Sequence, residues 1–479
     1  MRRLLFVAAA VLILAPQAAG AVDPMSWPSY GYDNQLGNAI QTRTLTQDAV
    51  RRLQLSWSAQ LDGPVFAQPL AATINDELRI FAATEAGTVY AVSATTGKIA
   101  WQRNLGVIET LECGTWGITS TGAIDLVRRL LFEISADGVL HALDLATGDE
   151  AAGYPRALIT NNRYEYVWGG LRIANGRLYV VNASYCDVGP PGGAFPEGRL
   201  LSIPLAHPED MTSWDPVPGP ANLGGMWGWG GVSVDADTGR LFTGVGNSSV
   251  WSDECGCYLD NAGYGNKVVE LEPDLSGVVD SNDPGIAATG DSDFGAAPLL
   301  FHPLACPPLA AMNNKNGTLY VWNRDRLSAG PLVSIPLGDG IAAFVGSPGW
   351  SETQQMIYSA QSVIRDGSRK VGNGITAWHA DPGCGFRPIW SRSLGDGSQA
   401  TPLVVGNTVF ATGGRPGSFY ALRAGSGDVL WSYPTEGRTV AAMISVAGGV
   451  FGADTTGVLY AFDPAPTPRG TGSPSRFPN

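Results

Sequence analysis

The sequence predicts an all-β protein, and more narrowly an eight-bladed β-propeller built from four-stranded antiparallel blades. Three observations predict this fold. A short glycine-led motif recurs along the 479-residue chain. Short apolar runs alternate with turns, in a chain that holds 62 glycines and 33 prolines without a collagen-like period. Each repeating unit also divides into four short strands, and such units must stack to bury their faces.

The recurring motif is clearest at 87–91, where the sequence reads Gly-Thr-Val-Tyr-Ala. Seven further copies follow at intervals of 40 to 67 residues. Four of them are clear and three are looser. The clear copies begin at Gly138, Gly317, Gly417 and Gly457, and the looser ones at Gly198, Gly265 and Gly374. This count predicts eight blades, and a seven-bladed ring or two separate β-domains are the alternatives.

The first unit illustrates the expected strands, at residues 68–72, 78–83, 88–92 and 99–102. Turn residues such as Thr96-Gly97 separate the last two strands. A strand with alternating polarity cannot bury its apolar face alone, so we expect the units to pack radially around an axis. Closing the ring also removes exposed sheet edges.

The last unit ends near Asp463 without a fourth strand. Residues 53–57, Leu-Gln-Leu-Ser-Trp, supply a candidate, so we predict that they complete the eighth blade. The propeller would then span 53–463. Residues 22–52 form an N-terminal extension, and residues 464–479, rich in proline, glycine and serine, are typical of a disordered tail.

Residues 1–21 are typical of a secretory signal peptide. Arg2 and Arg3 precede a short apolar run, and Ala19-Gly20-Ala21 provides small residues for cleavage. An uncleaved anchor is the alternative, although Pro16 interrupts the run. No later stretch is apolar for long enough to cross a bilayer, so we expect a secreted or periplasmic protein without a transmembrane segment.

The composition excludes two broad classes. Hydrophobic residues make up 44% of the chain and charged residues 15%, which is enough apolar material for a packed core and argues against whole-chain disorder. The formal net charge is −13 and the chain has no basic run. Binding to nucleic acid is therefore not expected, because the phosphate backbone requires a positively charged face.

Six cysteines in an exported chain favour disulfides. We expect the pairs Cys113–Cys186 and Cys306–Cys384. The cysteines of 255–257, Cys-Gly-Cys, either close a tight ring or form two longer bridges. Zinc is a poor alternative, because the four histidines lie near no CxxC motif. The chain has no CxxCH haem-attachment motif either.

Several units carry alanine, glycine and tryptophan at fixed offsets, as in Ala421…Gly427…Trp431 and in 91–101, which begins with Ala91 and ends with Trp101. This pattern resembles the tryptophan-docking motif of the quinoprotein dehydrogenases. These are enzymes of pyrroloquinoline quinone (PQQ) that include methanol, alcohol and polyvinyl-alcohol dehydrogenase-like propellers. The resemblance covers roughly residues 50–463. It implies that each tryptophan packs between neighbouring blades.

The resemblance also implies a site at the propeller axis, where PQQ stacks on an indole and Ca²⁺ bridges it to protein oxygens. Trp229 stands 18 residues before Asn247, the offset expected between the stacking indole and a Ca²⁺ ligand. Asp187 stands where the family has a glutamate ligand. Asp293 matches the catalytic aspartate, which also binds the metal, and Lys315 matches the cation that reaches the quinone oxygens. Each of these residues also has a structural alternative. Trp229 could belong to the core, and Asn247 could form a turn. Asp187 and Asp293 could be loop carboxylates, and Lys315 could be a solvated surface residue.

The chain departs from the family pattern in three ways. Residues 112–116, Glu-Cys-Gly-Thr-Trp, hold a single cysteine where many of these enzymes have an adjacent pair, and the arginine expected shortly afterwards is missing. Asp187 is one methylene shorter than glutamate. No fused haem domain is present in this sequence.

If the site is intact, the reaction is the oxidation of a small or polymeric alcohol. Asp293 would accept the hydroxyl proton, and Lys315 would stabilise negative charge on the reduced quinone. Ca²⁺ held by Asp187, Asn247 and Asp293 would polarise the quinone carbonyl. The electrons would pass to an external acceptor such as a soluble cytochrome c.

Two other functions remain open at this stage. A cofactor-free propeller could act as a protein-binding scaffold in the periplasm or cell envelope, with insertions at 189–196 and 252–263 forming its rim. A hydrolase or lyase acting on a polysaccharide would need paired carboxylates. Asp253 with Glu254, or Asp291 with Asp293, could supply such a pair.

Overall fold

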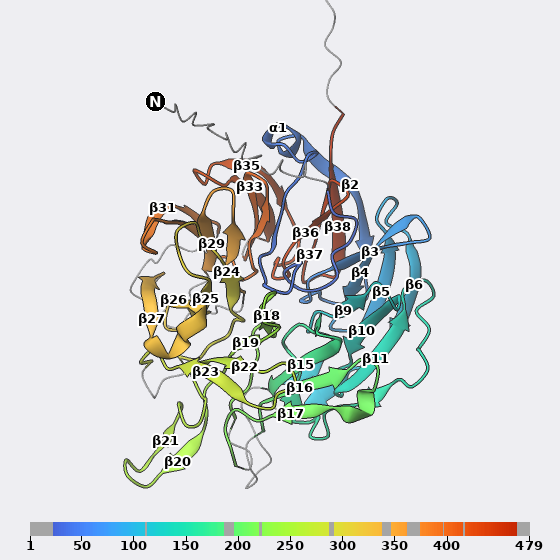
Figure 1. The fold of residues 1–479 in the computed structure, drawn as a ribbon. Coiled ribbons are helices and arrows are strands. Elements are labelled where there is room, and N and C mark those ends of the chain that lie inside the picture. Colours follow the sequence, from blue (N-terminus) through green and yellow to red (C-terminus); the bar gives the residue numbers. More distant parts are fainter. Residues whose placement is uncertain are drawn as a thin grey trace, which may run out of the picture.

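The computed structural model describes residues 23–110, 113–185, 196–219, 223–286, 292–337, 346–361, 374–395, 397–414 and 417–466. Within these ranges the chain forms eight sheets arranged around an axis, which are antiparallel except for one parallel pair in blade 7 (Figure 1). The first strand of each blade lies nearest the axis and the last lies outermost. The predicted all-β, eight-bladed propeller is confirmed.

The first four blades follow the chain from residue 70 to residue 282. Blade 1 contains β3 (Leu70–Ile74), β4 (Glu77–Ala83), β5 (Thr88–Ser93) and β6 (Ile99–Asn104). Blade 2 contains β9 (Ala123–Asp125), β10 (Leu130–Ile134), β11 (Val139–Asp144) and β12 (Arg156–Ala157). Blade 3 has five strands, β13 (Glu165–Tyr166), β14 (Arg172–Ala174), β15 (Arg177–Ser184), β16 (Arg199–Pro204) and β17 (Thr212–Trp214). Blade 4 contains β18 (Ser233–Val234), β19 (Leu241–Gly244), β22 (Val268–Leu271) and β23 (Val278–Asn282).

The other four blades complete the circle. Blade 5 contains β24 (Leu299–Phe301), β25 (Leu309–Asn314), β26 (Thr318–Asn323) and β27 (Pro331–Pro336). Blade 6 contains β28 (Gly349–Ser351), β29 (Met356–Gln361), β30 (Gly374–Ala380) and β31 (Phe386–Ser393). Blade 7 contains β1 (Ala39–Ile40), β32 (Leu403–Val405), β33 (Thr408–Gly413), β34 (Ser418–Arg423) and β35 (Val429–Pro434). Blade 8 contains β36 (Ile444–Val446), β37 (Gly449–Ala453), β38 (Val458–Pro464) and β2 (Leu53–Gln60).

Outside the blades, the described part of the chain forms two hairpins and three short helical segments. The hairpins are β7 (Ile108–Thr110) with β8 (Gly114–Trp116) and β20 (Val250–Ser252) with β21 (Cys257–Leu259). The helical segments are α1 (Gln47–Val50), η1 (Pro208–Asp210) and η2 (Arg324–Ala329). Among the described residues, none of these segments has the length and apolar character needed to cross a membrane.

The ring closes as predicted. Strand β2, at the N-terminal end of the propeller, pairs antiparallel with β38 and supplies the missing outer strand of blade 8. The register sets Trp57 opposite Ala461 and Gln60 opposite Val458. Because the first and last parts of the chain share one sheet, this blade joins the two ends of the ring.

The docking tryptophans lock neighbouring blades, as the motif predicted. Each indole covers a glycine of the next blade so closely that an added Cβ would come within 2.6 to 2.8 Å of the ring. Each indole N–H also donates to a carbonyl of that blade, at 2.8 to 3.1 Å. The pairs are Trp57–Gly97, Trp101–Gly148 and Trp390–Gly427. Glycine is therefore needed at these positions, both for space and for its positive φ of 71 to 76° at Gly97, Gly148 and Gly427.

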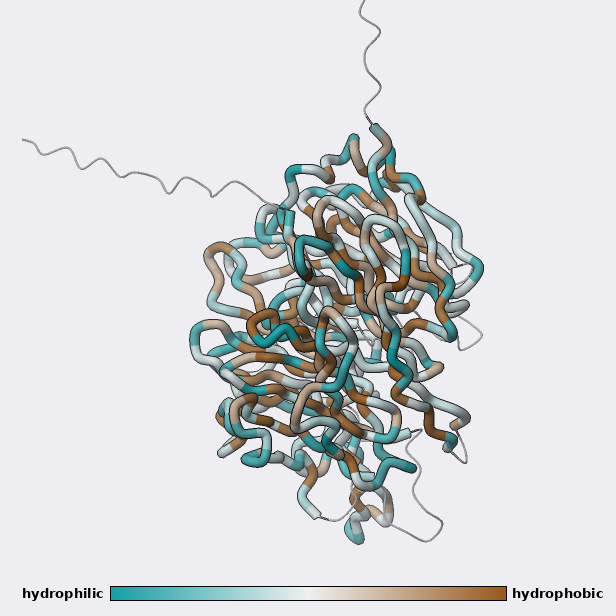
Figure 2. Tube along the Cα trace, turned by 90° about the vertical axis from the view of Figure 1, so that its right-hand side faces the viewer, coloured by the Kyte–Doolittle hydropathy of each residue, from teal (hydrophilic) through white to brown (hydrophobic). Residues whose placement is uncertain are grey.

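The hydrophobic core follows the blades, and the turns between strands are largely hydrophilic (Figure 2). Strand β5 of blade 1 is buried along its whole length, whereas most residues of the outer strand β6 are exposed. This gradient arises because an inner strand is covered by both neighbouring blades. It explains why the inner strands are apolar almost continuously.

The N-terminal extension, to which the sequence analysis assigned no role, crosses one end of the ring. Residues 24–38 form backbone hydrogen bonds with every blade except blade 3. In each blade the partner lies in the first strand or next to it. Blade 3 contributes the side chain of Arg172 instead. The backbone partners in blade order are Ala71, Ile124, Val234, Leu300, Trp350, Val404 and Ala447.

Arg172 is fully buried and holds this extension. Its guanidinium donates to the carbonyls of Asp33 and Tyr30, both at 2.9 Å, and to the hydroxyl of Ser29 at 2.6 Å. Burial lowers the pKa of Arg172 to about 10, partly offset by the nearby carboxylate of Asp33. The side chain therefore remains a cation at neutral pH.

Two disulfides are described. Cys306–Cys384, confirmed as predicted, joins the connections of blades 5 and 6. Cys255 and Cys257 bond to each other, so the tight ring forms rather than two longer bridges. Cys186, the expected partner of Cys113, lies outside the described residues.

Candidate active site

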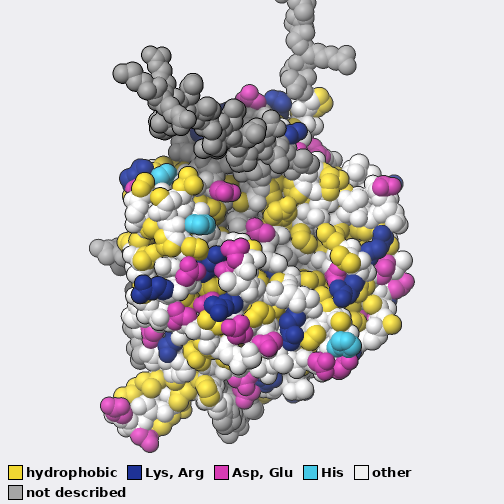
Figure 3. Space-filling view, viewed as in Figure 1, with side chains coloured by type: hydrophobic (Ala, Val, Ile, Leu, Met, Phe, Trp, Pro, Cys, Tyr) yellow, Lys and Arg dark blue, Asp and Glu magenta, His cyan; other side chains and the backbone are white. Residues whose placement is uncertain are grey.

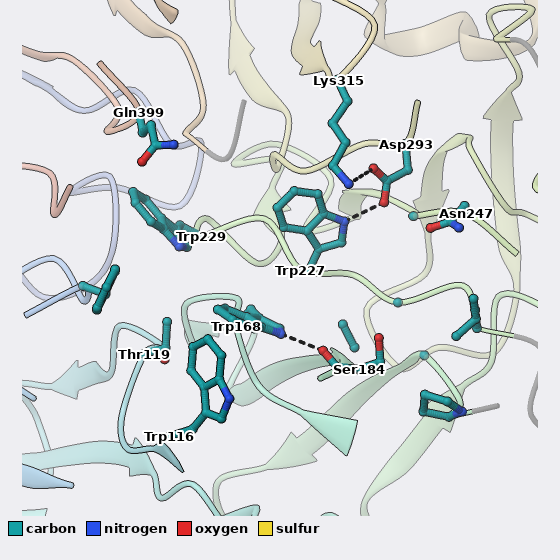
Figure 4. Close-up of a pocket in the computed structure, with 17 residues that line it drawn as sticks. Trp116, Thr119, Trp168, Ser184, Trp227, Trp229, Asn247, Asp293, Lys315 and Gln399 are labelled. Carbon is teal, nitrogen blue, oxygen red and sulfur yellow. Dashed lines mark hydrogen bonds and ion pairs between the residues drawn. The ribbon is translucent and has the colours of Figure 1, made fainter. Parts of the chain in front are cut away.

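A cavity of about 340 Å³ lies at the propeller axis, where connections of several blades meet (Figure 4). Most of its lining is apolar, and four indoles face it. The lining residues that carry chemistry or aromatic surface are Phe66, Trp116, Thr119, Trp168, Trp227, Trp229, Asn247, Asp293, Lys315 and Gln399. Four of the five residues expected from the sequence, Trp229, Asn247, Asp293 and Lys315, are therefore brought together.

The polar centre of the cavity is the carboxylate of Asp293, which is only 2% exposed. The ammonium group of Lys315 lies 2.9 Å from Oδ1. The indole N–H of Trp227 donates to Oδ2 over 2.9 Å. The Lys315 Nζ also lies 4.7 Å from the centre of the Trp227 ring, within reach of a cation–π contact.

Lys315 reaches the axis because it sits on the tight turn between β25 and β26. Gly317 closes that turn with φ of 81° and donates its N–H to the carbonyl of Asn314. The N–H of Lys315 donates to the carbonyl of Asp293 at 3.1 Å. The two residues are thus joined through backbone as well as side chains, which fixes their relative position.

Glycines leave room for the Trp227 ring and for the carboxylate. A Cβ on Gly295 would lie 2.2 Å from the Trp227 ring, and one on Gly246 would lie 3.1 Å from Oδ2 of Asp293. The Gly-Val-Gly-Asn stretch that ends at Asn247 therefore lets the backbone approach this site closely.

The two indoles of Trp227-Gly-Trp229 have different surroundings. Trp229 lines the cavity but is 8% exposed, and it packs in one cluster with Tyr30 and Leu36 of the N-terminal extension. Trp227 is half-buried and makes the contacts with Asp293 and Lys315. The 18-residue offset singled out Trp229, and the role of Trp227 was missed. The two indoles stand two residues apart in the sequence, and this Trp-Gly-Trp spacing was the available signal for Trp227.

The predicted metal ligands are only partly described. Asp187 lies outside the described residues, as does Asp291, which was considered only for the hydrolase alternative. Asn247 lines the cavity, and its backbone carbonyl accepts from Gly224 at 2.9 Å. Within the described ranges no three acidic, histidine or cysteine side chains gather as a metal site. One amide and one carboxylate that already faces two N–H donors fall short of the six to eight oxygens that calcium prefers.

The opposite wall consists of two further indoles. The rings of Trp116 and Trp168 lie edge to face with centroids 4.8 Å apart. Trp168 Nε1 donates to the carbonyl of Ser184 at 2.9 Å, which fixes its ring. Neither residue was predicted to belong to the site. The cavity is consequently walled by indoles on two sides, which suits a flat aromatic ligand.

A buried polar network lies behind this wall. The hydroxyl of Thr119, which lines the cavity, bonds to Glu85 and lies 2.8 Å from the hydroxyl of Tyr166. Burial raises the pKa of Glu85 above its ordinary 4.5, against hydrogen bonds from Thr119 and Gly117 that lower it. Burial also raises the pKa of Tyr166, so its hydroxyl stays protonated.

The residues present fit an aromatic anion such as PQQ better than they fit a metal ion. Indole faces offer stacking surface, Lys315 offers a positive charge, and glycines leave the space in which a flat ring system could lie. The fit to Ca²⁺ depends on Asp187.

Comparisons with known proteins show what the chain resembles in sequence and in fold. A family model described as outer membrane protein assembly factor BamB matches residues 54–195 and 374–466. The polyvinylalcohol dehydrogenase of Sphingopyxis sp. (strain 113P3) is 23% identical over 93% of this chain and 74% of its own length. Subunit 1 of the methanol dehydrogenase (cytochrome c) of Paracoccus denitrificans is 25% identical, over 51% of this chain and 44% of its own. The family model thus matches 235 of the 479 residues, and the chain is similar in sequence to PQQ-type β-propeller proteins.

Solved structures of this PQQ-type propeller fold superpose over nearly the whole chain. The quinohemoprotein alcohol dehydrogenase from Comamonas testosteroni matches with a TM-score of 0.72 at 17% identity, over 94% of this chain and 82% of that one. BamB from Moraxella catarrhalis matches with a TM-score of 0.53 at 14% identity, over 86% and 97%. These likenesses establish the fold, and the function of this PQQ-type propeller must come from its site.

Proposed function

We propose that the protein is an exported quinoprotein-type oxidoreductase, which oxidises an alcohol with PQQ and passes the electrons to an external acceptor. The observation that carries this proposal is the buried Asp293 carboxylate, held between the Lys315 ammonium and the Trp227 N–H in an indole-lined cavity. The dehydrogenase names of two relatives support it.

Asp293 is the proposed proton acceptor. Oxidation of an alcohol to a carbonyl compound releases two electrons and two protons, and the hydroxyl proton needs a nearby base. Lys315 compensates the charge of this carboxylate and holds it in one orientation together with Trp227. A carboxylate fixed in this way can accept a proton without first reorganising its surroundings.

PQQ, when bound, supplies the two-electron acceptor that no amino-acid side chain provides. Trp227 and Trp229 on one side, and Trp116 and Trp168 on the other, are the residues that would hold its ring system. Lys315 would face its anionic oxygens. The same indoles keep water from the reacting atoms.

Calcium binding is a more specific part of the proposal. Asn247 and Asp293 would contribute oxygens, and Asp187 would have to add the rest together with the cofactor and water. We derive no step through the metal. A small or polymeric alcohol as substrate, a cytochrome c as acceptor and a secreted or periplasmic location complete the proposal.

The test is reconstitution of the mature chain with PQQ and Ca²⁺, followed by reduction of an artificial dye with a panel of alcohols. We expect alcohol-dependent dye reduction in the parent protein. Asp293→Asn, which keeps the shape of the side chain, should lose at least about 100-fold in turnover while still binding PQQ. Turnover that survives this substitution would rule out Asp293 as the base.

The second candidate is a cofactor-free scaffold, favoured by the family model described as BamB. It predicts that PQQ does not bind and that substitutions in the cavity have no functional effect. It also predicts a protein partner that co-purifies with the exported chain. Binding of PQQ with an indole-dependent affinity would contradict it.

A further inference from the structure

The β20–β21 hairpin projects from blade 4 as an aromatic finger with an acidic tip (Figures 1 and 3). Trp251 and Tyr258 stand directly opposite each other in its register. Their rings lie edge to face with centroids 5.2 Å apart. The two residues are nevertheless 54% and 51% exposed, unlike most aromatic residues of this chain.

The finger is held in shape at both ends. At the tip, the Cys255–Cys257 disulfide closes a small ring. Trp251 Nε1 donates to Asp253 over 2.8 Å, which fixes the indole. At the root, the Ser248 hydroxyl donates to the carbonyl of Leu259 at 2.7 Å. A pre-ordered aromatic surface loses little side-chain entropy on binding, as an interaction site requires.

The finger begins at the cavity. Asn247, which lines the cavity, directly precedes Ser248 at the root. Leu223, another lining residue, forms a β-bridge with Ser248. A molecule seated on the finger would therefore lie beside the segment that carries part of the cavity wall.

The charge of the finger is entirely negative. Residues 241–266 contain Asp253, Glu254 and Asp260 and no lysine, arginine or histidine. An aromatic pair next to carboxylates complements a protein whose apolar patch is ringed by positive charge. A hydroxylated polymer could also use the aromatic faces, but it carries no charge to match the carboxylates.

We propose that this finger is the docking element for a small, positively charged haem protein that carries electrons. The inference rests on the proposed function, since each alcohol oxidised releases two electrons. Two such carriers would dock in turn. The ferric haem of each would accept one electron and become ferrous, while the two protons go to solvent. A small, charge-steered contact allows the rapid exchange that this requires.

The experiment measures binding of a basic cytochrome c to the immobilised full mature chain, without PQQ or alcohol, at about 20 mM and about 200 mM ionic strength. Binding should weaken at the higher salt. Trp251→Ala/Tyr258→Ala should raise Kd about tenfold or more, because aromatic anchors dominate such contacts. Asp253→Asn/Glu254→Gln should weaken binding at low salt and flatten the salt dependence. The same cytochrome with succinylated lysines should not bind.

Matched controls come from other exposed positions. Leu304→Ala removes a side chain of a residue that is 74% exposed in blade 5. Asp48→Asn/Asp149→Asn removes two carboxylates that are 82% and 78% exposed. Both control variants should bind the cytochrome like the parent, and the thermal unfolding of all variants should match, since the finger lies outside the core.

Equal binding by the finger variants and the parent would overturn the proposal, as would equal binding of the succinylated cytochrome. Loss of polyvinyl alcohol binding in Trp251→Ala/Tyr258→Ala with cytochrome binding intact would overturn it too, in favour of a polymer platform. Dye-linked turnover with PQQ is measured separately. It can fail or succeed independently of docking, so failure of the catalytic proposal is distinguishable.

Discussion

Lys315 forms an ion pair with Asp293 at the propeller axis, with 2.9 Å between Nζ and Oδ1, although 21 residues separate them in the chain. Both belong to connections of blade 5, and a backbone hydrogen bond of 3.1 Å joins them as well. The carboxylate is buried, so its charge depends on this cation and on the Trp227 N–H. Under the proposed function, a substitution in this pair should therefore change both the stability of the fold and the activity.

Replacing Lys315 by Gln should destabilise the fold by about 1–3 kcal/mol, because it leaves a buried carboxylate without its cation. Turnover should also fall by at least about 100-fold, since the fixed charge facing the cofactor is lost. Urea denaturation measures the first effect. Asp293→Asn/Lys315→Gln should recover most of the stability but none of the activity. A double variant no more stable than Lys315→Gln would contradict the coupling.

Substitutions of the two indoles of the Trp-Gly-Trp motif should have different effects. Trp227→Ala should weaken PQQ binding by about tenfold or more, as loss of a stacking ring and of the hydrogen bond to Asp293 implies. Trp229→Ala should chiefly lower stability, by about 3 kcal/mol, because that ring packs on Tyr30 and Leu36. Fluorescence titration measures the PQQ affinity of each variant, and urea denaturation measures its stability. The reverse pattern would favour the assignment made from the 18-residue offset.

Features of the fold that depend on local packing were predictable from the sequence, whereas features that depend on contacts between distant residues were not. The repeats and the Trp–Gly pairs such as Trp101–Gly148 are enforced by local packing, so eight blades, the closing strand and the docking indoles could be read from the sequence. The site residues could be listed because each carries distinctive chemistry. The choice between Trp227 and Trp229 could not be made, because it depends on which ring faces Lys315 and which faces the extension.

The crossing of residues 24–38 over the ring end was not predictable for a related reason. Its contacts are mostly single backbone hydrogen bonds to seven blades, which leave no side-chain pattern in the sequence. The side-chain hydrogen bonds of Tyr30, Asn38 and Arg172 join residues far apart in the chain, so they leave no local pattern either. An isolated arginine in a strand is normally read as a surface residue.

Replacing Arg172 by Lys should cost about 2–4 kcal/mol of unfolding free energy. Lysine has neither the planar fork nor enough donors to satisfy the carbonyls of Tyr30 and Asp33 together with Ser29. Limited proteolysis should then cut residues 24–38 faster. Arg103→Lys, at a residue whose side chain is 44% exposed, is the control and should change little. Unaltered stability in Arg172→Lys would show that the extension does not depend on it.

Glu133 should make the stability depend on pH. Burial raises the pKa of this carboxyl well above its ordinary 4.5, and the N–H of Gly122 lowers it only in part. As pH rises above 4.5, the unfolded chain loses the proton first, so the folded state becomes less stable relative to it. Glu133→Gln removes this effect. Between pH 5 and 8 the stability of this variant should rise relative to that of the parent, measured by urea denaturation. A constant difference across this range would contradict the argument.

The most direct test of the central claim is a single-turnover experiment without any electron acceptor. The mature chain is loaded with PQQ under anaerobic conditions, alcohol is added, and the quinone absorbance is followed. We predict that the bound quinone is reduced and that one alcohol is oxidised per site. Asp293→Asn should still bind PQQ, but its bound quinone should be reduced at least about 100-fold more slowly. A quinone spectrum that no alcohol changes, or that changes equally fast in the variant, would contradict the account.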